Sequence, residues 1–400
     1  RVPVTAGPHE ISVAFLANNQ AFEPMRLQSF VRSSVDNFDW AGHPHLQSLT
    51  VSGPFDAAKQ ASDTPSRRRI FTCTSSTECA KSILTRIASQ AYRQPTSPAD
   101  LERIMAAYSQ EKDFEAGVQS GIARVLASPK FTFRAESPGR ITDLELASRL
   151  SFYLWSSIPD ERLMQLAAKG DLKKPAVLEA ETKRMLDDPR AEALTKNFAG
   201  QWLQLRNLAN FQPNTDLYPD FDDNLRQAFR QETELLFKNV LTEKRSVLEL
   251  LNADYTFVDE RLARHYGIPN IHGSRFRKVP VSDEARQGLL GQGSILALTS
   301  HAERTSPVLR GKWVLENLLG LQVPPPPPDV PPLKDREDGQ KPRTMREQMT
   351  EHRANPVCAA CHKTLDPIGF SLENFDAVGS WRAMDAGNPV DASEIGRAHV

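Results

Sequence analysis

The sequence lacks three features that would assign it to a common functional class. It has no excess of basic residues, because 49 Lys and Arg are balanced by 50 Asp and Glu, so we expect no nucleic-acid partner. It has no apolar run of the roughly 18 residues that a membrane-spanning helix needs, so we expect no transmembrane segment in this stretch of chain. Cysteine is also scarce, with four residues among 400. Length and composition predict a globular protein of roughly two to four domains.

The sequence also lacks an initiator methionine and a signal peptide, since it begins at Arg1. We interpret it as a fragment whose N-terminal part is missing. At the other end, residues 394–400 resemble the in-frame translation of a sequencing adapter. We therefore expect a non-native tail there and assign no role to His399.

What the sequence does contain is one strong cysteine motif near its C-terminal end. Cys358, Cys361 and His362 form Cys-x-x-Cys-His, the attachment signature of a c-type haem. With so few cysteines, a chance match is expected in on the order of one in a thousand such sequences. Two thiols three residues apart lie on one helical turn and can each bond to a haem vinyl group, and the adjacent histidine binds the iron as proximal ligand. We predict one covalent haem c.

Three other interpretations of this cysteine pair remain open. A structural zinc site usually has four ligands in two pairs, and no second cysteine pair lies nearby. A thioredoxin-type redox pair follows a strand, whereas the residues before Cys358 have a helical pattern. Two buried structural thiols are the third alternative.

The haem motif also predicts the cellular compartment. Covalent haem attachment takes place outside the cytoplasm, so we expect a periplasmic or otherwise exported protein. In an oxidising compartment the other two cysteines, Cys73 and Cys79, can form a disulfide. The alternative is two free thiols.

The spacing of apolar residues predicts a mainly α fold with several consecutive helical domains. The exception is residues 1–55, where Ile11, Val13 and Phe15 alternate with smaller or polar residues, as in a half-buried strand. We expect strand mainly there, as the C-terminal part of a β-sandwich. The predicted boundaries are 1–55 for this partial sandwich, 56–69 for a linker, 70–135, 140–268 and 275–320 for helical domains, 321–343 for a proline-rich strap and charged loop, 344–393 for a truncated c-type haem segment and 394–400 for the non-native tail.

No residue is predicted to be catalytic. Glu232 lies on the apolar stripe of a predicted helix, where a buried carboxylate must be paired or protonated, and a structural ion pair is the usual case. Ser300 and His301 are neighbours in sequence, which does not give the geometry of a catalytic triad. Ser306 is explained as the cap of a helix that starts at Pro307.

Several longer motifs follow one another along the chain. They are Ala91-Tyr-Arg93, Glu145-Leu-Ala-Ser-Arg-Leu150, Asn197-Phe-Ala-Gly-Gln-Trp202, Ala253-Asp-Tyr-Thr-Phe257, Arg304-Thr-Ser-Pro-Val-Leu-Arg310-Gly-Lys-Trp313, Asp366-Pro-Ile-Gly-Phe370 and Glu373-Asn-Phe-Asp376. With these motifs and the haem signature, nearly all of residues 1–385 resembles the planctomycete-type multidomain cytochrome c-like proteins. That family consists of exported proteins built from consecutive domains of unknown function. Its members often carry a sugar-binding-like sandwich, so the resemblance implies a carbohydrate-binding-like type for the partial sandwich over 1–55.

The resemblance implies haem binding through Cys358, Cys361 and His362, and no further haem residue. It also implies redox partner proteins and, as a candidate partner, a polysaccharide. The reason for the second is that members of the family look like proteins encoded beside polysaccharide-degrading systems. We expect electron transfer, in which both axial positions of the iron are filled by the protein. A peroxidase-like haem enzyme and a binding or scaffold protein with an auxiliary haem are the alternatives.

The sixth iron ligand separates these functions. Met384 is the methionine downstream of the motif, while Met345, Met349 and His352 lie upstream on a short helix that Thr344 and Glu347 cap. Met349 and His352 are three residues apart and share a face, so each can approach the iron. Their alternative role is as surface residues of an amphipathic helix.

The haem is also expected to pack against the third helical block, the predicted domain over 275–320. With about 35 native residues after Cys358, the haem segment is too short to fold unaided. Docking would bring Arg304 or Arg310 near the haem, with Arg382 as the rival partner of a propionate. Asp366 and Pro367 indicate a turn after the motif.

Overall fold

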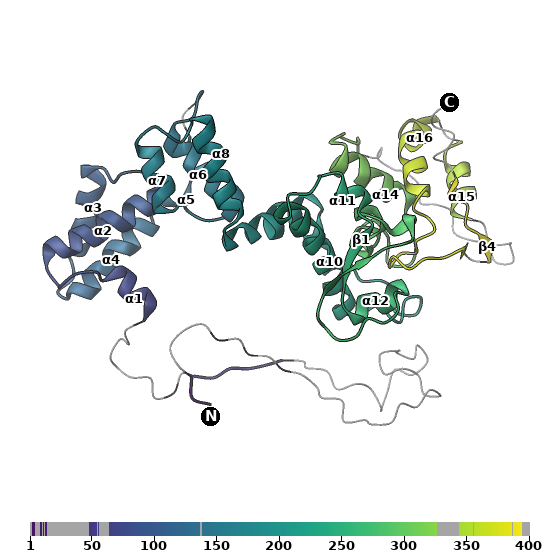
Figure 1. Cartoon of the computed structure of the whole chain (residues 1–400), viewed down its shortest axis with the longest axis horizontal. Helices are drawn as coiled ribbons and strands as arrows, with labels where there is room; N and C mark the ends of the chain where they lie inside the picture. The colour runs from purple at the N-terminus through teal and green to yellow at the C-terminus, as the bar shows by residue number, and fades with distance from the viewer. Residues whose placement is uncertain are drawn as a thin grey trace. The chain divides into compact units, whose positions relative to one another are not determined.

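The computed structural model describes residues 2–4, 9, 11, 13, 48–53, 55, 64–136, 138–325, 344–354, 356–385 and 387–393. Over these residues the fold is mainly α, as predicted (Figure 1). The chain forms two compact units, one ending at Ala191 and the other starting at Glu192, and each is described by itself. None of the described helices is both long and apolar enough to cross a membrane.

The predicted β-sandwich falls mostly outside the described residues. Phe15 is one of the residues not described, and the described residues between 2 and 55 form no strand. The sandwich therefore stays a prediction, as do the non-native tail over 394–400 and the strap and loop over 321–343, of which residues 326–343 lie outside the described ones.

The first unit starts with a small helical bundle. Its helices are α1 (Pro65–Ile70), α2 (Thr77–Tyr92), α3 (Pro98–Tyr108), α4 (Phe114–Leu126) and α5 (Pro129–Thr132). Ser97 accepts a hydrogen bond from the backbone N–H of Asp100, with Pro98 in the first turn, as the sequence predicts. Ile83, Leu84 and Val118 belong to its core and are almost fully buried.

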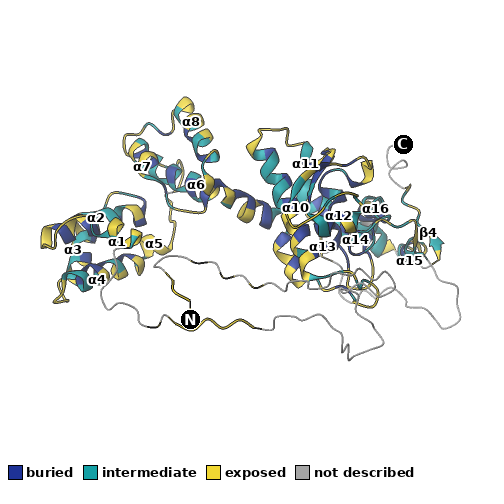
Figure 2. Cartoon of the chain, turned by 60° about the horizontal axis from the view of Figure 1, so that its bottom comes forward, coloured by how far each residue is buried: buried dark blue, intermediate teal, exposed yellow. Residues whose placement is uncertain are grey.

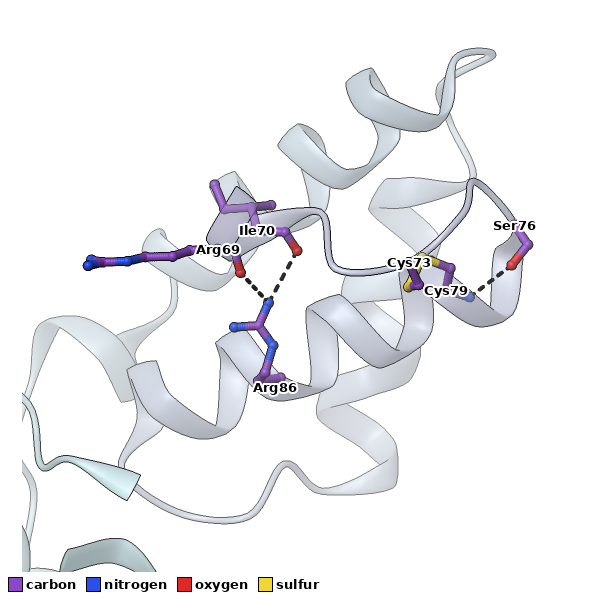
Figure 3. The surroundings of a disulfide bond; sticks show 6 residues. All are labelled: Arg69, Ile70, Cys73, Ser76, Cys79 and Arg86. Atoms are coloured by element: carbon purple, nitrogen blue, oxygen red, sulfur yellow. Dashed lines mark hydrogen bonds between the residues drawn. A yellow bond between two sulfur atoms is a disulfide. The ribbon is translucent and has the colours of Figure 1, made fainter. Parts of the chain in front are cut away.

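A disulfide joins Cys73 to Cys79, as one of the two sequence interpretations predicted. It ties the loop after α1 to the first turn of α2 (Figure 3). Further along α2, the guanidinium of Arg86 donates to the backbone oxygens of Arg69, at 2.7 Å, and Ile70, at 3.2 Å. These contacts attach α1 to a bundle that buries none of the α1 residues.

The same unit continues with α6 (Asp143–Trp155), α7 (Glu161–Ala168), α8 (Pro175–Leu186) and a turn of 3-10 helix, η1 (Pro189–Ala191). Thr142 and Glu145 form a reciprocal capping box at the start of α6. The indole N–H of Trp155 donates to the backbone oxygen of Met185 at 2.8 Å. This bond joins the end of α6 to the end of α8.

The second unit is built around one long helix. Its elements are η2 (Leu194–Ala199), α9 (Gly200–Trp202), η3 (Leu205–Asn210), α10 (Asp223–Thr242), α11 (Glu249–Asn252), β1 (Tyr255–Val258), α12 (Glu260–Tyr266), β2 (Arg277–Pro280), η4 (Glu284–Arg286), η5 (Leu289–Gly291), α13 (Gly293–Leu298), α14 (Pro307–Trp313), η6 (Val314–Leu318), α15 (Met345–His352), α16 (Pro356–Phe370), β3 (Met384–Asp385) and β4 (Asn388–Pro389). The apolar face of α10, with Leu225, Phe229 and Leu236, lies in a large core (Figure 2).

Two local features of this unit differ from the sequence-based expectation. The stretch expected to be helical around Tyr255 is instead the strand β1, which pairs antiparallel with β2 from Tyr255 opposite Pro280 to Val258 opposite Arg277. The turn expected at Asp366 and Pro367 lies inside α16, which continues to Phe370. A proline inside a helix removes one backbone hydrogen bond. Helix α16 nevertheless continues past Pro367 to Phe370, where it is in close contact with α14.

Candidate functional site

Helix α16 brings the three predicted haem residues together. Cys358, Cys361 and His362 lie in its first two turns, and residues three or four apart on a helix are neighbours. Both thiols are free and half-buried. The arrangement therefore leaves two reactive thiols and an imidazole on adjoining positions of one helix.

The imidazole of His362 is oriented by a buried carboxylate one turn later. Its Nδ1 lies 2.8 Å from Oδ1 of Asp366, whose side chain is fully buried. Because a carboxylate can only accept, Nδ1 carries the proton and donates it, which leaves the lone pair on Nε2. A histidine that binds a metal usually has such an acceptor on its other nitrogen. The chemistry of these residues thus fits a c-type haem.

Asp366 also holds the segment that precedes the motif. Nε of Arg353, the C-cap residue of α15, lies 3.5 Å from Oδ2 of Asp366. The sequence analysis did not identify Asp366 or Arg353 as site residues. The one-turn spacing from His362 to Asp366 was the signal that could have found the first of them.

The alternative interpretations of the cysteine pair gain no support. In the described ranges, no group of three or more His, Cys, Asp and Glu side chains is arranged to hold a metal ion, so no zinc site is found there. The element before Cys358 is the helix α15, as the sequence pattern predicts, whereas a thioredoxin-type pair follows a strand.

The motif-bearing helix α16 packs directly on α14 of the third helical block. The predicted packing of the haem itself stays a prediction. A Cβ atom built on Gly311 would overlap the carbonyl oxygen of Leu365, and one built on Gly369 would overlap that of Pro307. Both Cβ–oxygen distances would be below 3.0 Å, and real Cβ atoms essentially never come that close to another atom. Two glycines, one on each helix, therefore allow the two backbones to touch.

A buried ion pair fastens the loop after α16 to α14. The fully buried guanidinium of Arg310 donates to Oε1 of Glu373 at 3.1 Å, and to the backbone oxygens of Leu372 at 2.6 Å and Asp376 at 2.9 Å. Arg382 donates to the other oxygen of Glu373 at 3.2 Å. Burial lowers the pKa of Arg310 to about 10, and the Glu373 charge opposes this shift. Arg310 thus has a structural role, which explains its place in the motif better than a haem propionate does.

The candidates for the sixth ligand have different surroundings. His352 is the last residue of α15, and its ring centre lies 4.9 Å from that of His362, with the planes at 72°. Met349 is buried, with 2% of its surface exposed, whereas Met384 on β3 is 53% exposed. Met345 begins α15.

Glu232 lies outside the haem motif and is fully buried on α10. It accepts hydrogen bonds from the hydroxyls of Thr256 and Tyr266, each at 2.6 Å. Burial raises its pKa to about 7, while the two hydroxyls and the charge of Arg286 oppose the shift. The expected direct ion pair is therefore replaced by two hydroxyl donors.

The serines near His301 have structural partners. Ser300 donates to the backbone oxygen of Leu296 at 2.8 Å, and Ser306 accepts from the backbone N–H of Leu309 at 3.3 Å, as the cap of α14. The predicted capping role of Ser306 is confirmed.

Two hollows of small-molecule size lie beside other residues. One, of about 760 Å³, is in the first unit and includes Arg93, Phe133 and Thr142 in its lining. The other, of about 480 Å³, is in the second unit between α10 and α12 and includes Gln227, Arg264 and Phe276. Neither shares a lining residue with the haem motif, so the candidate haem site does not use them.

Comparison with protein families finds three matches in sequence order. Residues 79–136 match PSD5, a protein of unknown function (DUF1595), residues 141–268 match PSD4, a protein of unknown function (DUF1592), and residues 286–385 match PSCyt3, a protein of unknown function (DUF1588). No similar curated protein and no similar solved structure was found. The chain therefore carries three consecutive domains of unknown function, in the planctomycete-type multidomain arrangement that its motifs predict.

Proposed function

We propose that the chain is an exported electron-transfer protein with one haem c, attached through Cys358 and Cys361 and bound at the iron by His362. The observation that carries this proposal is the hydrogen bond from Nδ1 of His362 to the buried carboxylate of Asp366. It presents Nε2 to a metal in the correct tautomer, beside two free thiols. A bound haem supplies reversible one-electron chemistry at its iron.

The residues of the chain have distinct tasks in this proposal. Cys358 and Cys361 would hold the haem through two carbon–sulfur bonds, for which each S–H would add across a vinyl group without an oxidant. Asp366 keeps the proton on Nδ1 of His362 and fixes the orientation of the imidazole. The contact between α14 and α16 and the Arg310–Glu373 pair hold the segment on the domain core.

Export is supported by the Cys73–Cys79 disulfide, because structural disulfides persist mainly in oxidising compartments. Redox partner proteins follow from electron transfer as the function. The proposed link to polysaccharide breakdown rests on the family resemblance.

The test is expression of the chain with the haem-attachment machinery, followed by a haem-stained denaturing gel and intact-mass analysis. We expect one covalent haem in the parent chain and none in a variant with Cys358→Ala and Cys361→Ala. The matched control replaces the other cysteine pair, Cys73 and Cys79, by alanine and should keep the haem. Equal staining of all three proteins would refute the proposed attachment site.

A further inference from the structure

We propose that His352 is the second axial ligand of the haem iron, so that the iron is held between two histidines. This inference rests on the proposed function, because it adds a ligand to the haem attached at Cys358 and Cys361. It concerns the side chain that fills the position opposite His362.

The first argument is the contact between the two imidazoles. The ring of His352 lies against that of His362, with 4.9 Å between ring centres and 72° between planes. In the described part of the chain, no hydrogen bond or ion pair to the His352 ring is found, so neither of its nitrogens has a protein partner there. A partly buried imidazole without a partner, in contact with a predicted iron ligand, is available for coordination.

The second argument is the small movement that coordination requires. A metal–imidazole bond is about 2 Å long, so two histidines on opposite sides of one metal ion place their nitrogens about 4 Å apart. The centre of an imidazole lies about 1 Å beyond its bound nitrogen, so two such ligands would have ring centres about 6 Å apart. The ring centres of His352 and His362 are 4.9 Å apart, so the rings would have to separate by on the order of 1 Å and admit the haem between them. His352 is the last residue of α15, where the helix gives way to the short link to α16, so this movement does not bend a helix in its middle.

The third argument is a common anchor for both histidines. Asp366 accepts from His362 and also pairs with Arg353, the residue directly after His352. One buried carboxylate therefore sets the orientation of one imidazole and the position of the chain next to the other. Asp366 is a positioning residue in this arrangement.

The rival ligands are placed less well. Met349 lies on the same helix and is 2% exposed, and in the described part of the chain no contact between it and the ring of His362 is found. Met384 lies on β3 and is 53% exposed. His352 is the candidate whose ring touches that of His362.

Two histidine ligands determine what the haem can do. With both axial positions filled, peroxide has no open site on the iron, and the protein acts as an electron carrier. A histidine in place of methionine also gives a lower reduction potential, since methionine–histidine ligation raises it.

The experiment uses the full chain with its haem attached and measures absorption and electron paramagnetic resonance spectra beside covalent haem content. We expect a low-spin ferric haem without a methionine–iron charge-transfer band. His352→Ala should keep its covalent haem but lose the low-spin signal, and added imidazole should restore it. His352→Met should gain the charge-transfer band and a higher reduction potential.

Met349→Leu and Met384→Leu are the matched controls and should leave the parent spectrum unchanged. A charge-transfer band in the parent chain would overturn the inference without any variant, and so would a low-spin spectrum that survives His352→Ala without imidazole. In both cases the haem remains attached, so the proposed function would stand. A parent chain without covalent haem would refute the proposed function, and the inference with it.

Discussion

Replacing Gly369 by alanine should destabilise the docking of the haem segment. The new Cβ atom would overlap the carbonyl oxygen of Pro307, so α16 would have to move away from α14. Overpacking of a close contact typically costs about 1–3 kcal/mol. Alanine also favours a helix interior over glycine by roughly 0.5–1 kcal/mol. The steric cost is the larger, and we expect a net loss of about 1–2 kcal/mol.

Gly200→Ala is the matched control. Gly200 is also a helical glycine, in α9, but a Cβ atom built there has no neighbour within 4 Å. Only the gain in helix propensity applies, so this variant should be more stable than the parent by up to about 1 kcal/mol. The two glycine-to-alanine changes should thus have opposite signs.

The measurement is hydrogen exchange of the backbone amides in α14 and α16, read as opening free energies. A residue-level method is needed because a chain with two compact units need not unfold in one transition. Gly311→Ala should have a similar effect, since its Cβ would overlap Leu365 in the same interface. The double variant should lose less than the sum, because one displacement relieves both overlaps. If Gly369→Ala protected these amides as well as the parent does, the reasoning would fail.

Three further predictions concern buried groups and the disulfide. Arg310→Met should destabilise the second unit by on the order of 2 kcal/mol, measured by hydrogen exchange of its amides, because the buried backbone oxygens of Leu372 and Asp376 lose their donor, while Arg382 still pairs with Glu373. For Glu232, the folded-state pKa of about 7 lies above the usual 4.5, so its contribution to stability is lost as pH rises between these values. The stability of the parent relative to Glu232→Gln should fall by about 3 kcal/mol over this window, whereas a flat difference would contradict the burial of a titrating carboxyl. Because burial lowers the pKa of His265 from 6.5 to about 4, stability due to His265 is lost as pH falls through that window, so only the difference between the two proteins isolates Glu232. Alkylation without reductant should leave Cys73 and Cys79 unmodified in intact-mass analysis, and replacing both by serine should cost about 2 kcal/mol.

The parts of the fold that depend on local physics were predictable from the sequence. The capping box of Thr344 and Glu347 and the Ser306 cap with Pro307 lie where the spacing of these residues predicts them. Gly267 ends α12 with a positive φ of 72°, as its place after the last apolar residue predicts. Each of these depends on contacts within one turn of helix.

Elements that depend on distant partners were not predictable in this way. The strand at Tyr255 forms because it pairs with residues around Val279. Helix α12 lies between the two strands in sequence, so a local sequence pattern cannot predict their pairing. Pro367 stays inside α16, although a proline locally favours a helix end. In both cases tertiary packing overrides the local preference.

The candidate site divides along the same line. Cys358, Cys361 and His362 follow from a motif of five residues, whereas the approach of His352 depends on how α15 and α16 fold back on each other. From the sequence alone, Arg310 was also a candidate partner for a haem propionate. Its burial against Glu373 involves residues 63 positions apart, so no local pattern predicts it. A sequence motif thus predicts the attachment chemistry, and only the fold shows what surrounds the motif.

The position of Asp366 connects the domain core to this chemistry. Leu365, the residue before it, has its carbonyl oxygen against Gly311 of α14. The contact between the two helices therefore sets the position of Asp366 relative to α14. Asp366 in turn holds His362 and Arg353. The close glycine contact is therefore part of the positioning of the proposed iron ligand, even though neither glycine lies near the cysteines in sequence. This gives a physical reason why Arg304-Thr-Ser-Pro-Val-Leu-Arg310-Gly-Lys-Trp313 and the haem signature occur together in one domain.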